Sequence, residues 1–402
     1  MSEIEAELTP SSQAATQEFR CSPQQRRLWV LELPASSQRL CCAVDIEGPL
    51  DSARLRNAVD EVAKAHEILK ANLTGLPNGT PVANANGGIV WDDPIDLSAL
   101  SAAERQEKLE QAWSECTWAS PDPEFGPPIR LRLASWQSGH RLFISLSPLL
   151  GDRSTLGLLV QAIAQAYEAG ENDYSYGGLQ YAKFAEWQNG LIETPDPSLD
   201  EARAFWQEKA SKLTATVLPA ARDLPSFPGF LPEVVSLSLD ADMANSIAMS
   251  AALLGVSETD FLFAAWCAFL WRWSRGENCQ TGFVSSGRSS IDELKGLMGL
   301  VARCLPIQVD IDGAMPFGDF VGAIQNKVQA ALEWEDYFLF ASLSPNSGAP
   351  ASLDLAFEYS ESLAPIAAGA LTWTLSLEEV IQEPFKLKLG CRRTGEKLDI
   401  EL

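Results

Sequence analysis

The stretch Phe143–Leu159, FISLSPLLGDRSTLGLL, decides how this sequence is interpreted. It predicts a strand, then a short loop, then an amphipathic helix with Ser154 as its N-cap. A loop between a strand and a helix often carries a catalytic side chain. This loop begins Ser147-Pro148 and contains no His, Cys or Glu. The sequence therefore raises the question of whether this is an active site without its base or was never an active site.

The composition indicates a soluble globular protein with a substantial core. The chain has 402 residues, of which 46% are hydrophobic and 21% charged. The net charge of −24 argues against nucleic acid and anionic membranes as partners, although solubility alone accounts for it. The longest uncharged apolar run, Phe261–Trp271, is too short for the roughly 20 residues that span a bilayer.

The cysteines and the N-terminus favour the cytoplasm. None of the eight cysteines forms a C-x-x-C pair, so a zinc site is not expected. The first twenty residues are acidic and polar, unlike a secretion signal. We therefore expect reduced thiols in a cytoplasmic protein.

The order of predicted elements indicates two similar α/β lobes. Residues 1–18 form a flexible acidic tail, 19–189 the N-terminal lobe, 190–232 a Pro-rich linker with a charged helix, and 233–402 the C-terminal lobe. In the N-terminal lobe, residues 50–73 predict one helix, capped by Asp51 or Ser52. Closing strands are predicted at 353–360, 370–376, 385–393 and 397–402.

Candidate catalytic groups are few. The chain has no G-x-S-x-G elbow, glycine-rich phosphate loop, metal cluster or dinucleotide fingerprint. Of its two histidines, His66 lies on the apolar face of its predicted helix and is interpreted as structural, and His140 is expected to face solvent. Asp152 precedes a helix, where capping or an ion pair is favoured over orienting a catalytic neighbour.

Five segments in order resemble motifs of the condensation domains of nonribosomal peptide synthetases. SPQQRRLWVL (Ser22–Leu31) resembles S-x-A-Q-x-R-L-W-x-L, AHEILKANL (Ala65–Leu73) resembles R-H-E-x-L-R-T-x-F, and YAKFAEWQ (Tyr181–Gln188) resembles Y-x-D-Y-A-x-W-Q. Met298–Val309 keeps mainly the glycine of its motif, and Glu333–Phe338 keeps only an Asp-Tyr pair. The resemblance runs from about residue 20 to the end.

The resemblance implies two chloramphenicol acetyltransferase-like lobes in a V-shaped arrangement. It also implies a tunnel between the lobes that admits carrier-bound substrates. The family's H-H-x-x-x-D-G motif aligns with Ser147–Arg153. Ser147 and Pro148 replace the two histidines, Arg153 replaces the glycine, and only Asp152 is kept. In the family this aspartate serves structure through a salt bridge, for which Arg288 is the implied partner. Proline cannot remove a proton, so the family mechanism is not expected here.

The resemblance leaves three functions open. The first is a non-catalytic interaction domain, whose partners are the downstream adenylation and carrier domains or a recruited tailoring enzyme. The second is an atypical starter acyltransferase assisted by Ser147 or Asp152, and the third is a vestige kept for folding. No cofactor is expected, except phosphopantetheine as the arm of a partner carrier. We also expect an excised piece of a synthetase or a standalone relic, with a truncated C-terminal lobe.

Overall fold

The computed structural model describes residues 18–34, 37–75, 81–118, 121–171, 173–193, 199–211, 232–275, 279–339 and 353–402. They form two compact units. Unit 1 comprises the described residues up to Leu191 together with Arg288–Val301 and Leu363–Glu383, and unit 2 comprises the remainder. Most of the predicted tail 1–18 and of the linker 190–232 lies outside the described residues.

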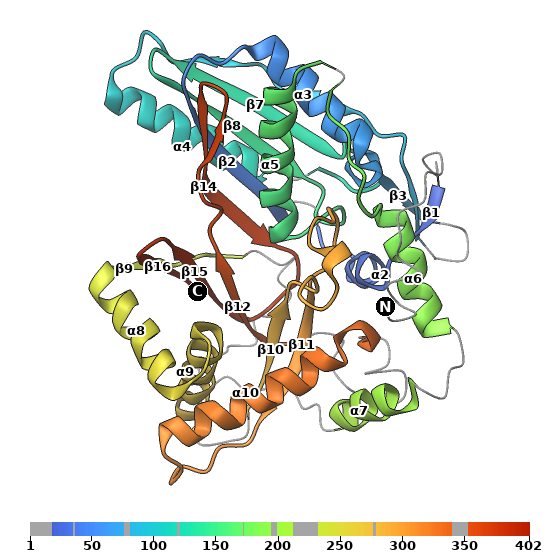
Figure 1. Cartoon of the computed structure of the whole chain (residues 1–402), viewed down its shortest axis with the longest axis vertical. Coiled ribbons are helices and arrows are strands. Elements are labelled where there is room, and N and C mark those ends of the chain that lie inside the picture. The colour runs from blue at the N-terminus through green and yellow to red at the C-terminus, as the bar shows by residue number, and fades with distance from the viewer. Residues whose placement is uncertain are drawn as a thin grey trace. The chain divides into compact units, whose positions relative to one another are not determined.

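Unit 1 is built on a mixed seven-stranded sheet with the order β13-β14-β2-β8-β7-β5, in which β6 also pairs with β7 (Figure 1). The strands β2 and β8 are central, and β8 leads directly into the Ser147 loop. The bounds are β2 Arg39–Glu47, β5 Ile89–Trp91, β6 Ile95–Asp96, β7 Ile129–Trp136, β8 Gly139–Leu146, β13 Ile366–Ala368 and β14 Leu371–Ile381. A small second sheet joins β1 (Glu18–Arg20), β4 (Pro81–Asn84) and β3 (Asn72–Gly75).

Helices cover both faces of this sheet. The helices α3 (Ser52–Ala65) and α5 (Arg153–Ala169) pack on one face, and α4 (Ala102–Trp118) packs on the other (Figure 1). Successive residues of β2 alternate between the two faces, because a strand has a period of two. Cys42 therefore joins the α3/α5 core and Ala43 the α4 core. The remaining helices near this sheet are α2 (Pro23–Val30) and α6 (Tyr181–Glu193).

The strand β14 comes from the last part of the sequence yet belongs to unit 1. It pairs antiparallel with β2 along its length, with a bulge between Leu375 and Leu377. The prediction placed this strand in a continuous C-terminal lobe, 233–402. The pairing with β2 and the burial of Leu371 and Trp373 in the α3/α5 core explain why the strand folds with unit 1 instead.

Unit 2 holds a six-stranded sheet with the order β11-β10-β12-β15-β16-β9. Its core is rich in aromatic rings, including Phe263, Phe283 and Phe357, whose ring centroids lie 5.2–6.2 Å apart. The strands are β9 Ser236–Leu239, β10 Cys279–Ser285, β11 Arg303–Val309, β12 Leu355–Glu361, β15 Leu387–Thr394 and β16 Lys397–Glu401, and the helices are α7 Asp200–Ser211, α8 Ala241–Leu254, α9 Glu258–Trp273 and α10 Phe317–Glu333.

Within the described residues, no single helix has the length and apolar character to cross a membrane. The consecutive helices α8 and α9 pass that test only as a pair, and they are bent by 98° at their junction.

The α/β class, the two lobes and the four closing strands are confirmed, but two local predictions are wrong. The predicted helix at 50–73 ends at Ala65, because His66 adopts an extended conformation, and a 3-10 turn and β3 follow. Asp51, rather than Ser52, caps its start. The helix α5 begins at Arg153 with Asp152 as its N-cap, so Ser154 lies inside the helix rather than at its cap. The V-shaped arrangement and the tunnel stay predictions.

Candidate functional site

The candidate site is the loop Ser147–Asp152, which the end of β8 and the start of α5 hold in place. The Ser147 N–H donates to the carbonyl oxygen of Pro128 at 3.0 Å, and the Leu150 N–H donates to that of Ser147 at 2.9 Å. Every residue of the loop is buried. The backbone of this segment is therefore fixed inside unit 1.

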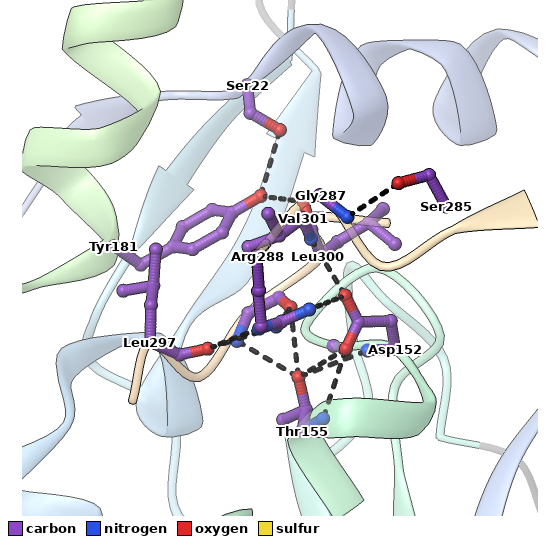
Figure 2. A network of polar contacts seen from close by, with 12 residues as sticks. Ser22, Asp152, Thr155, Tyr181, Ser285, Gly287, Arg288, Leu297, Leu300 and Val301 are labelled. Carbon is purple, nitrogen blue, oxygen red and sulfur yellow. Dashed lines mark hydrogen bonds and ion pairs between the residues drawn. The ribbon is translucent and has the colours of Figure 1, made fainter. Parts of the chain in front are cut away.

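Asp152 is the polar centre of this region, and it is 1% exposed. One carboxylate oxygen caps α5, accepting from the Thr155 N–H at 3.0 Å. The other accepts from the Arg288 guanidinium at 2.8 Å and from the Val301 N–H at 2.9 Å (Figure 2). The structure therefore brings Asp152 and its implied partner Arg288 together. All of these contacts are made within unit 1.

The Arg288 side chain is buried and bound from several sides. Its guanidinium also donates to the carbonyl oxygen of Leu297 at 3.0–3.2 Å (Figure 2). It donates to the carbonyl oxygen of Gly299 at 3.0 Å as well. These bonds fix the fold of the segment Arg288–Val301, and the bonds of Gly299 to Thr155 and of Val301 to Asp152 tie this segment to the N-terminus of α5. The sequence carried no signal for the carbonyl partners, because any residue type supplies the same backbone oxygen.

Residues of the family-like segments meet in the same network. The Tyr181 hydroxyl donates to the Leu300 carbonyl oxygen at 2.8 Å and lies 2.9 Å from the Ser22 hydroxyl (Figure 2). Gly299 has φ +139°, and an added Cβ there would lie 2.0 Å from the Tyr181 ring. Only glycine fits this close approach. Ser22, Tyr181 and Gly299, matched as separate motif residues, thus form one structural unit.

Two glutamine side chains hold the loop backbone. The Gln25 amide donates to the Leu149 carbonyl oxygen at 2.9 Å. The Gln382 amide, just past β14, donates to the carbonyl oxygens of Pro148 at 2.6 Å and Gly151 at 2.8 Å. Sequence reasoning missed Gln382, because 234 positions separate it from Pro148.

The two positions that align with the family's histidines differ in what they offer. The Pro148 ring has no titratable group and no N–H. The Ser147 side chain is buried, and its hydroxyl has no hydrogen-bond partner among the described residues. Arg153, at the position of the family's glycine, forms a long ion pair of 3.8 Å with Glu378 of β14. Neither of these two positions therefore carries an imidazole.

Both histidines of the chain lie elsewhere. The His66 ring nitrogen Nε2 is 3.1 Å from the Tyr174 hydroxyl, and burial lowers the pKa of His66 to about 4. His66 is therefore a satisfied, buried histidine. His140 lies at the other end of β8, about 23 Å of strand away from Ser147. It is half-buried, with Nδ1 2.9 Å from the Ser135 hydroxyl, and burial lowers its pKa.

The last two family-like segments meet within unit 2. Arg303, from Met298–Val309, pairs with Asp336, from Glu333–Phe338, at 3.0 Å and donates to the Glu335 carbonyl oxygen. Burial raises the pKa of the Glu335 carboxyl. No group of three or more His, Cys, Asp or Glu among the residues that the structure describes could hold a metal ion.

Comparison with known proteins gives a consistent result. The family model described as "Condensation domain" matches residues 15–401. The chain is 26% identical over 340 residues to chondramide synthase cmdD of Chondromyces crocatus, and 25% identical over 338 residues to tyrocidine synthase 3 of Brevibacillus parabrevis. Each match covers 82% of this chain but only 8% and 5% of the respective relatives.

Solved structures of similar fold include an X-domain. The X-domain from teicoplanin biosynthesis has a TM-score of 0.79 and 21% identity, covering 98% of this chain and 91% of that one. The first condensation domain of the CDA synthetase has a TM-score of 0.79 and 18% identity, covering 96% and 90%. An X-domain in complex with OxyB has a TM-score of 0.77 and 22% identity, covering 98% and 90%. At these identities the likeness concerns the fold.

Proposed function

Since this chain belongs to the condensation domain family, we propose that it works in a nonribosomal peptide synthetase without forming peptide bonds itself. In this proposal its role is to bind another protein. The partner is either an adenylation or carrier domain of the same synthetase or a tailoring enzyme recruited to it. Phosphopantetheine enters only as the arm of a carrier, and the expected location is the cytoplasm.

The observation that carries the proposal is the composition of the Ser147–Asp152 loop. Amide formation needs a group that takes the proton from the attacking amine as it bonds to the thioester carbonyl. Pro148 has no such group, and Ser147 has no base beside it to activate its hydroxyl. Asp152 is engaged by Arg288 and by the α5 cap, so its carboxylate is already occupied.

The interaction role is supported by two further observations. The loop and its surroundings are densely hydrogen-bonded, which agrees with a fold maintained without the catalytic histidines. An X-domain of similar fold is known in complex with OxyB, so the fold accommodates a bound protein partner in that case.

The first test is an amide-forming assay. The purified chain is mixed with a carrier loaded with an acyl donor and a carrier loaded with an aminoacyl acceptor, and product is followed by mass spectrometry. We expect product no faster than without the protein. Product above this background that is lost in Ser147→Ala would show a catalyst and overturn the proposal.

The second test asks whether the domain matters to its synthetase. We expect deletion of residues 1–402 to abolish peptide production, and adding the domain in trans to restore it. The variant Ser147→Ala should restore production equally well, because its hydroxyl has no role in binding a partner. Undiminished production by a soluble deletion protein would favour a vestige kept for folding.

One observation favours the starter acyltransferase as a second candidate. The Ser147 hydroxyl is buried without a partner among the described residues, at the position of a family histidine. A starter condensation domain of rhizomide synthetase, of similar fold, has been solved with C8-CoA and Leu-SNAC. Supplying an acyl-CoA donor in the assay above distinguishes this candidate, since only a starter enzyme would consume it.

A further inference from the structure

On the α4 face of the unit 1 sheet, two cysteines distant in sequence lie together. Cys41 of β2 is opposite Ser145 of β8 in the strand register, so both side chains point to this face. Cys116 is in the last turn of α4 and packs against the α4 core beside Ala43. Ala43, two positions after Cys41 on the same face of β2, packs in this core with Cys116, and neither cysteine forms a disulfide.

The two thiols differ in accessibility. Cys41 is 1% exposed, and its sulfur also donates to the Glu379 carbonyl oxygen at 3.7 Å. Cys116 is half-buried and lines a cavity of about 220 Å³, together with Asp92, Glu115, Arg130, Arg132 and Ser145. Cys116 therefore borders the cavity, and Cys41 does not.

The residues that line the cavity carry both signs of charge, with the carboxylates of Asp92, Asp93 and Glu115 beside the guanidinium groups of Arg130 and Arg132. Arg130 pairs with Asp92 at 2.8 Å, and Arg132 pairs with Glu115 at 2.5 Å. Guanidinium and carboxylate groups side by side suit a small zwitterion, which presents ammonium and carboxylate groups of its own. An arm of a peptide-like disulfide such as glutathione disulfide has this character.

We propose that Cys116 is a site of thiol oxidation by a small zwitterionic disulfide and that Cys41 is its resolving partner. The Cys116 sulfur attacks one sulfur of the reagent, forming a mixed disulfide and releasing one thiol with the proton from Cys116. The Cys41 sulfur then attacks the Cys116 sulfur and releases the second thiol with its own proton. The two cysteines are oxidised, and one reagent disulfide is reduced to two thiols.

The second step is favoured by the loss of the contact between the thiols. Hydrogen bonding to Cys116, with burial as the next cause, raises the pKa of the Cys41 thiol. In the mixed disulfide the Cys116 sulfur can no longer carry a negative charge. Its hydrogen-bonding and charge contributions, which both raise the pKa of Cys41, therefore weaken, and Cys41 ionises more readily. The two sulfurs must approach to about 2.05 Å to form the bond.

The neighbouring Cys42 provides a matched control. It follows Cys41 directly in β2 but points to the opposite face, into the α3/α5 core. The test incubates the full folded chain with glutathione disulfide, blocks the remaining thiols, and maps disulfides in unreduced digests by fragment-ion mass spectrometry. Fragment ions separate Cys41 from Cys42 in the unaltered protein, so the result does not depend on any variant folding.

We expect a Cys41–Cys116 bond in the unaltered chain and in Cys42→Ala, and a persistent mixed disulfide at Cys116 in Cys41→Ala. Cys116→Ala should form neither product, and oxidation should raise the urea midpoint of the unaltered chain but not of Cys116→Ala. The proposal fails if folded protein leaves Cys116 unmodified, if the mixed disulfide persists in the unaltered chain, or if the bond formed is Cys42–Cys116. It does not depend on the proposed function.

Discussion

Asp152 has a structural role at the N-terminus of α5. Its carboxylate caps α5, pairs with Arg288 and accepts from the Val301 N–H, all while buried. A buried ion pair is not in itself a strong source of stability, but breaking one partner leaves an uncompensated charge. The contacts of the aspartate therefore give it a structural role in unit 1.

The substitution Asp152→Asn should destabilise the protein by about 3–5 kcal/mol, because it leaves the Arg288 guanidinium buried without its counter-charge. Urea unfolding would measure the change. The matched control is the double variant Asp152→Asn, Arg288→Met, which removes both charges and should cost less than the sum of the two single variants. Additive losses would show that the two side chains do not interact.

His66 makes unit 1 sensitive to acid. Burial lowers its pKa to about 4 from an ordinary value near 6.5, so the unfolded chain binds more protons than the folded chain between these values. The contribution of neutral His66 to the free energy of unfolding is fully present above pH 6.5. It is lost as the pH falls toward 4.

We expect the free energy of unfolding to fall by about 3 kcal/mol from this histidine between pH 6.5 and 4, as the pKa difference requires. Urea unfolding of unaltered chain and His66→Gln across this range would measure it, and the variant should show a flatter profile. The variant His140→Gln is the control, because His140 is half-buried and should alter the profile less. Identical profiles for His66→Gln and the unaltered chain would contradict the assignment.

At the scale of elements, β14 has the largest influence on the site. It completes the sheet beside β2, its Glu378 meets Arg153, and the following Gln382 holds the loop backbone. Arg153, which the resemblance aligns with the family's glycine, thus pairs with this strand. The loop is shaped both by its own residues and by a strand more than 200 positions away.

The substitution Trp373→Ala in β14 should destabilise unit 1 by about 3–5 kcal/mol, because this ring is 1% exposed in the α3/α5 core. Thr372→Ala, on the adjacent exposed position, should change stability by less than about 0.5 kcal/mol. Hydrogen exchange would locate the effect, with faster exchange expected in β2 and not in β12. Equal acceleration in β12 would contradict the assignment of β14 to unit 1.

Elements with strong periodicity were predictable, and their ends were less so. The four closing strands and the helix that follows the Ser147 loop were identified from alternation and helical spacing. The end of α3 was not, because apolar spacing continues through Ile68 and Leu69 in the 3-10 turn. Asp152 and Ser154 are both residue types that favour a helix N-cap, and the prediction chose Ser154. Asp152 is the cap in the structure, and the network that selects Asp152 cannot be seen in the sequence.

For the whole molecule, the two α/β lobes followed from the sequence, but the membership of their segments did not. The local sequence pattern identifies β14 as a strand. It does not identify β2 as the strand with which β14 pairs, because that depends on which sheet has an open edge. The Asp152–Arg288 contact was reached only through the family resemblance, because 136 positions separate the two residues. The placement of Cys41 and Cys116 on one face of the sheet had no sequence signal, since neither residue lies in a recognisable motif.

The placement of β14 next to β2 also bears on how the protein emerges from the ribosome. β2 is complete once Glu47 is made, but its neighbour on one side is encoded roughly 320 residues later. At about 5–20 residues per second, that edge of β2 waits roughly 16–65 s for its partner. A strand edge left open for so long is a template for pairing with other nascent chains. Slower translation before residue 371 should therefore lower the yield of soluble protein.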